Sequence, residues 1–152
     1  MVVPKFRAWV EAEETMHPVL SLDWSGIDDD LTVFVPMGHT SSRAVSIDNA
    51  VLMRSTGVFD VNGKEIFEGD VFTYLDDDNN PIYENIVVKF GQHTNMDTIY
   101  ERGPVYIGLY VEAQKGTATL EIDSMYNDCE GRLTIIGNIY ENLELVEVNN
   151  DQ

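Results

Sequence analysis

The stretch from Ser55 to Tyr74, STGVFDVNGKEIFEGDVFTY, has the clearest alternation of turns and strands in the chain. Asn62-Gly63 favours a tight turn that needs a positive φ. Glu68-Gly69-Asp70 predicts a second turn, which leads into a strand beginning at Val71. Two sharp turns around the short Ile66-Phe67 pair are typical of the opening of a small SH3-like barrel.

Apolar residues alternate along most of the remaining chain, as they do in half-buried strands. Val105 to Val111 and Ala118 to Ile122 are two such runs, and the turn 114–116 between them predicts a β-hairpin. Further strands are expected at 6–10, 31–35, 71–75, 86–90 and from 133, with a bulge or a close approach of neighbouring backbones at Gly137. Helical signals are confined to 48–53, 95–102 and 123–130. The pattern predicts a mainly β fold, α+β at most.

The change in pattern near Ser55 predicts two subdomains and a tail. Residues 1–54 are expected to form an N-terminal β-rich subdomain, residues 55–148 a small SH3-like β-barrel, and residues 149–152 a tail. The chain has 152 residues, which is enough apolar material for a packed core without disulfide bonds.

The chain is strongly acidic. Nine Lys and Arg face 27 Asp and Glu, which gives a net charge of −18. This balance argues against direct binding to a nucleic-acid backbone and against docking on an anionic membrane. The single cysteine, Cys129, and the lack of a long apolar run favour a protein of the cytoplasm.

Four blocks of sequence resemble the YopX family of phage and prophage proteins. They are FRAWV at 6–10, LMRSTG at 52–57, the stretch 55–74, and IIGNIYENLELV at 135–146, which includes GNIYEN at 137–142. They occur in the family's order and together span nearly the whole chain. The chain departs from the family pattern at Leu143, where a proline is usual, and in a longer segment at 91–104.

The resemblance implies a mainly β or α+β fold with SH3-like character. It also implies expression in the cytoplasm of an infected or lysogenic bacterium, and self-association. It implies no reaction and supplies no catalytic, cofactor-binding or metal-binding residues.

Several acidic residues, the histidines and the cysteine could form a metal site or a catalytic site, but their sequence context indicates ordinary structural roles. Asp76 to Asn80 begins like a calcium loop, but Pro81 and Val87 stand where an EF-hand needs glycine and glutamate. His17, His39 and His93 lack the spacing of a zinc site. Acidic neighbours raise the pKa of the Cys129 thiol, which disfavours a nucleophile. We therefore expect no metal or cofactor.

Glu65, Glu68 and Asp70 could supply a general acid and a general base. They match the paired carboxylates of glycoside hydrolases, but a chain with 27 acids produces such pairs by coincidence, and turn geometry already explains these. The sequence thus predicts a non-enzymatic module that contacts a protein partner or a second copy of itself. The first alternative is an acidic DNA mimic that inhibits a host nucleic-acid-binding protein, and a hydrolase using buried carboxylates ranks last.

Overall fold

The described part of the chain consists mainly of β-strands. The computed structural model describes residues 5–26, 30–75, 77–78, 80–94, 105–113, 119–121 and 132–147. The chain divides into two compact units, Met1–Ser55 (unit 1) and Thr56–Gln152 (unit 2). The prediction of a mainly β fold is confirmed. None of the helices in the described ranges is long and apolar enough to span a membrane.

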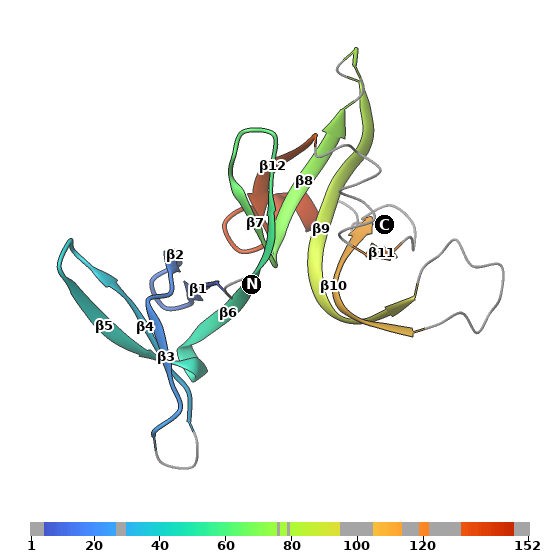
Figure 1. Cartoon of the computed structure of the whole chain (residues 1–152). Coiled ribbons are helices and arrows are strands. Elements are labelled where there is room, and N and C mark those ends of the chain that lie inside the picture. Colours follow the sequence, from blue (N-terminus) through green and yellow to red (C-terminus); the bar gives the residue numbers. More distant parts are fainter. Residues whose placement is uncertain are drawn as a thin grey trace. The chain divides into compact units, whose positions relative to one another are not determined.

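Unit 1 contains two small antiparallel sheets, of order β2-β1-β6 and β3-β4-β5. Its strands are short, and β6 continues past the unit boundary (Figure 1). The strands are β1 (Phe6–Val10), β2 (Thr15–Pro18), β3 (Ser21–Asp23), β4 (Thr32–Met37), β5 (Ser41–Ser46) and β6 (Ala50–Phe59). The predicted strands at 6–10 and 31–35 are confirmed, as β1 and β4.

The core of unit 1 consists of small and β-branched side chains from both sheets. A compact cluster suits such residues, because two short sheets can approach closely when the side chains between them are small. Its buried members are Ala8, Val10, Val33, Val35, Val45 and Ala50.

The helical turn predicted for residues 48–53 is wrong. A single turn of 3-10 helix covers Ile47–Asn49, and the Ser46 hydroxyl caps it by accepting the Asp48 N–H at 3.2 Å. From Ala50 the chain is already in β6, whose first five residues, Ala50 to Arg54, pair with β1. Long-range pairing therefore outweighs the local helical signal. The helices predicted at 95–102 and 123–130 lie outside the described residues.

Unit 2 is built on a five-stranded antiparallel sheet of order β11-β10-β9-β8-β12, with β7 beside β6. The sheet curls into a half-barrel around β8, β9 and β10 (Figure 1). The elements are β7 (Glu65–Phe67), β8 (Asp70–Leu75), β9 (Pro81–Thr94), β10 (Val105–Ala113), β11 (Thr119–Glu121), β12 (Leu133–Asn138) and the short helix α2 (Glu144–Glu147). The predicted hairpin is confirmed as β10–β11.

Three register shifts occur in the described part of this sheet. The register of β8 and β9 shifts between Phe72 and Tyr74, where Asn85 has a φ of 52°, and again between Tyr74 and Leu75. The register of β8 and β12 shifts between Ile135 and Gly137, which confirms the bulge predicted at Gly137. Because a bulge bends its strand and increases the local twist, these shifts promote the curl of the sheet.

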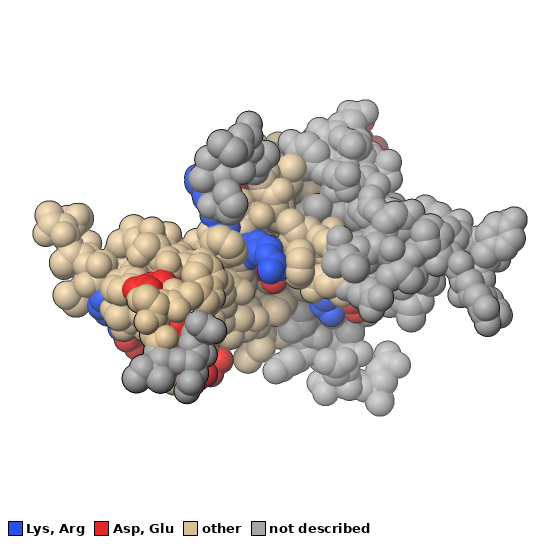
Figure 2. Space-filling view, turned by 60° about the horizontal axis from the view of Figure 1, so that its bottom comes forward, with Lys and Arg blue, Asp and Glu red and all other residues tan. Residues whose placement is uncertain are grey.

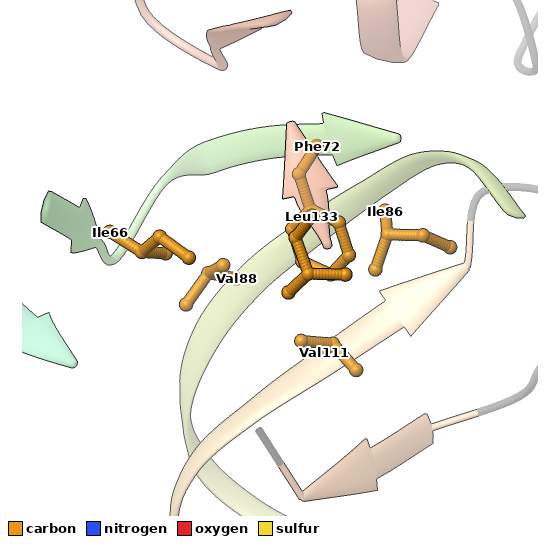
Figure 3. Packing of buried hydrophobic residues seen from close by; sticks show 6 residues of the cluster. All are labelled: Ile66, Phe72, Ile86, Val88, Val111 and Leu133. Carbon is orange, nitrogen blue, oxygen red and sulfur yellow. The ribbon is translucent and has the colours of Figure 1, made fainter. Parts of the chain in front are cut away.

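The concave side of the sheet holds the core of unit 2. The buried side chains come from β7, β8, β9, β10 and β12 and point toward one another (Figure 3). They are Ile66, Phe72, Ile86, Val88, Val111 and Leu133. Strands distant in sequence thus share one apolar cluster, which fixes the positions of the turns around it.

Candidate functional site

The most buried carboxylates of unit 2 organise turns. Asp60 is 6% exposed, and its Oδ1 accepts the main-chain N–H of Asn62 at 2.9 Å and of Lys64 at 2.8 Å. Its Oδ2 accepts the N–H of Ile135 at 3.1 Å, in β12. One carboxylate therefore closes the Asn62-Gly63 turn and attaches it to a strand about seventy residues further along the chain.

Asp70, weighed above as a catalytic acid, plays a similar part. It is 1% exposed, and its Oδ2 accepts the Phe67 N–H at 2.8 Å across the turn between β7 and β8. In this turn the Gly69 N–H donates to Val88 at 2.8 Å, and its carbonyl accepts the Ile139 N–H at 2.9 Å. Glycine fits here because φ is 85°. Asp70 is thus engaged by the backbone of its own turn.

The GNIYEN segment forms a compact turn after β12. The Asn138 Oδ1 accepts the N–H groups of Tyr140 at 3.0 Å and of Glu141 at 2.8 Å. In return, the Asn142 Oδ1 accepts the Asn138 N–H at 3.1 Å. Gly137 lies directly against the Asn142 amide, which leaves no room for a Cβ atom. The close neighbour of Gly137 is therefore a side chain, whereas the prediction named a bulge or a neighbouring backbone.

The other acids and histidines considered above as catalytic or metal-binding residues lie at separate places in the fold. Glu65 lies in β7 and Glu68 in the following turn, and both are half-buried. Asp77 is 85% exposed and pairs with Arg132 at 2.5 Å. His39 is exposed in the turn between β4 and β5. Within the described ranges, no group of three or more His, Cys, Asp or Glu is arranged to hold a metal ion.

Other weighed residues lie where the structure gives no side-chain description. These are Asp76, Cys129 and the side chain of His93. The nucleophile and calcium-loop readings of these residues stay untested.

A charged cluster joins the turn after β1 to β5. Nη1 and Nη2 of Arg43 donate to Oε1 and Oε2 of Glu13, respectively, at 2.5 Å. This hydrogen bonding lowers the pKa of Glu13 below its ordinary value of 4.5. Thr15 Oγ1 lies 3.3 Å from the same carboxylate and 2.7 Å from Nε2 of His17. The cluster therefore fixes the side chain of Arg43 on one face of β5.

The backbone of β4 shows which way the groups of β5 point. The Ile47 N–H donates to Leu31 at 3.1 Å, so Leu31 faces β5, whereas the Leu20 N–H donates to Phe34 at 2.8 Å, so Phe34 faces β3. Because backbone groups alternate along a strand, odd-numbered residues of β4 bond to β5 and even-numbered ones bond toward β3.

It follows that β5 has an open edge. Val45 and Arg43 face their β4 partners Val33 and Val35. The N–H and C=O groups of the exposed residues Ser42, Ala44 and Ser46 therefore point away from β4. In the sheet order β3-β4-β5, no described strand pairs with β5 on that side (Figure 1).

One of the two edge strands of the unit 2 sheet, β12, differs from β5 because it is covered. The Val61 N–H donates to the Leu133 carbonyl of β12 at 2.9 Å, and Asp60 accepts the N–H of Ile135. Native sheets commonly blunt their edges in this way, with a loop or an inward-pointing charge. The open edge of β5 is therefore the candidate functional site.

Charged side chains form small groups on the described surface. On the face shown in Figure 2, uncharged residues make up most of the described surface, and acidic and basic side chains form small groups. The sequence from 31 to 47 contains no Asp or Glu and is the longest such stretch in the chain. It includes all of β4 and β5, so the open edge carries no negative charge of its own.

The sequence reasoning missed two features, the buried Asp60 of unit 2 and the strand β5. Asp60 precedes Asn62-Gly63, a position from which an aspartate characteristically accepts the N–H groups of a following turn. β5, of sequence SSRAVS, gave no strand signal because its outward positions hold only serine and alanine.

Comparisons with known proteins agree with this fold. The YopX protein X-ray structure from Bacillus subtilis is 22% identical, with a TM-score of 0.54, and covers 93% of this chain and 96% of that one. The crystal structure of protein EF1440 from Enterococcus faecalis is also 22% identical, with a TM-score of 0.48, over 97% of this chain and 100% of that one. No functionally curated protein matches the chain.

A family comparison covers most of both units. The model of the family described as "YopX protein" matches residues 5–147, which include all four sequence blocks that carry the resemblance. The chain therefore belongs to the YopX family.

Proposed function

We propose that the chain is a non-enzymatic protein-interaction module, encoded by a phage or prophage and acting in the cytoplasm of the bacterial host. The observation that carries this proposal is the open edge of β5, with the backbone groups of Ser42, Ala44 and Ser46 directed outward. An exposed edge of this kind pairs readily with an added strand, whose main-chain hydrogen bonds supply affinity.

The use of the buried acids supports a role without catalysis. A general acid or a nucleophile needs a carboxylate that is free to reach a substrate. Asp60 and Asp70 instead accept main-chain N–H groups at 2.8 to 3.1 Å. These contacts explain the burial of both acids by the fold alone.

Capture of host proteins at two salt concentrations tests the proposal. Immobilised wild-type chain is incubated with a lysate of the host, beside an Ala44→Lys variant in which a charge blocks the edge. Strand pairing predicts capture that survives high salt and is lost in the variant. Capture that disappears as salt rises, in wild type and variant alike, would instead favour the acidic DNA mimic, because charge contacts are screened. No capture at either salt concentration, with no self-association, would refute the proposal.

A further inference from the structure

We infer that the open edge of β5 pairs with β5 of a second copy of this chain. The inference rests on the proposed interaction function and names its partner. The two strands would run antiparallel across a two-fold axis at Ala44, which joins the β3-β4-β5 sheets of both copies into one continuous sheet.

The directions of the backbone groups select this register. A two-fold axis at Ala44 places it opposite its own equivalent and places Ser42 opposite Ser46 of the second copy. All three residues point their N–H and C=O groups outward, so each facing pair exchanges two hydrogen bonds, about six in total. An axis at Arg43 would bring together residues whose groups already bond to β4.

The side chains of β5 suit self-pairing. On one face, the facing residues are Ser42, Ala44 and Ser46, which are small and exposed and leave room for a second strand. On the other face, Arg43 lies opposite Val45 of the second copy, so the two arginines do not face each other. Arg43 is also neutralised by Glu13 of its own chain. Like charges directly opposite one another would destabilise such a pair.

The charge pattern favours a second copy at this position. Two chains of net charge −18 repel each other, and close contact is least costly where acids are absent. Residues 31–47 are the longest acid-free stretch of the sequence, and β5 forms its exposed edge. The geometry and the charge thus point to the same six residues.

Sedimentation velocity over a range of protein concentrations tests the inference. Wild-type chain is expected to form a dimer, and more of it at high salt, because screening reduces the repulsion between the two copies. Ala44→Lys brings two ammonium groups to the two-fold axis and should weaken the dimer about tenfold or more. Val61→Lys adds the same charge at a position that is 57% exposed in unit 2, and should leave the dimer unchanged.

Crosslinking gives a positive readout of the register. In an antiparallel hydrogen-bonded pair the facing Cα atoms are about 5.5 Å apart, a distance that a disulfide spans. In a Cys129→Ser background, A44C should form a covalent dimer under mild oxidation, whereas V61C should not.

The outcomes separate this inference from the proposed function. A chain that is monomeric at every concentration, or a dimer that Ala44→Lys leaves intact, overturns self-pairing through β5. Salt-resistant capture of a host protein that Ala44→Lys abolishes would then still support the interaction module. A dimer weakened by Val61→Lys in place of Ala44→Lys would move the interface to unit 2.

Discussion

Replacing Gly137 by alanine tests how strongly the turn after β12 depends on close packing. A Cβ built at Gly137 lies 2.7 Å from Cγ of Asn142 and 3.0 Å from Cδ1 of Leu145. Inserting a methyl group into so tight a contact costs about 1–3 kcal/mol. The φ of 159° adds backbone strain, which is on the order of 1–3 kcal/mol. We therefore expect Gly137→Ala to lower the free energy of unfolding of unit 2 by about 2–6 kcal/mol.

Gly108→Ala is the matched control. Gly108 has a φ of 155°, close to that of Gly137, but a Cβ built there meets no heavy atom within 4 Å. This variant carries the backbone strain without the collision. The difference between the two variants therefore measures the contact with Asn142 and Leu145.

Urea unfolding followed by far-UV circular dichroism measures both variants. Tryptophan fluorescence gives a separate signal for unit 1, because both tryptophans, Trp9 and Trp24, belong to that unit. Combining Gly137→Ala with Asn142→Ala should cost less than the sum of the two single changes, since the second removes atoms that the new methyl group meets. Equal losses for the two glycine variants, or strictly additive effects, would refute this reasoning.

Three further predictions concern charged side chains. Asp60→Ala should destabilise unit 2 by about 3–5 kcal/mol in urea unfolding, because three main-chain N–H groups lose a charged acceptor and only those in the exposed turn regain one from water. Asp77→Asn should change stability by less than about 0.5 kcal/mol in the same assay, because its ion pair with Arg132 is exposed. Arg43→Gln should raise the pKa of Glu13 toward 4.5 in an NMR titration. Because the fold lowers this pKa, the stabilisation from Glu13 is present above pH 4.5 and is lost as the pH falls through the lowered pKa. The stabilities of the wild type and of Arg43→Gln should therefore converge in acid.

Strands with apolar residues at every second position were predictable from the sequence. β10 packs Leu109 and Val111 against the core of unit 2, so the period of two appears directly in its residues. Gly137 was predictable for a related reason, because a glycine within a strand signals a bulge or a close approach. The predictable part of the fold is therefore the part built around the larger apolar core.

The strands β2, β3 and β5 were not predicted, and they explain why the candidate site was missed. Each is short and mostly polar, and its position depends on a neighbour that the sequence does not identify. The same holds for Asp60, whose turn is visible in the sequence but whose bond to Ile135 is not. Pairing partners distant in the chain decide both features.

The segments that carry the family resemblance meet one another in the structure, and this limits what the resemblance says about function. The Ile139 N–H bonds to Gly69, and the Ile135 N–H bonds to Asp60, which joins the block 55–74 to the block 135–146. Changes there should cost several kcal/mol, whereas a change at an exposed edge residue such as Ala44 typically costs less than about 0.5 kcal/mol. β5 lies outside all four blocks, so its edge can change without loss of the fold. Under the proposed self-pairing, a relative with lysine or proline at the position of Ala44 should therefore fold in the same way and yet fail to pair through β5.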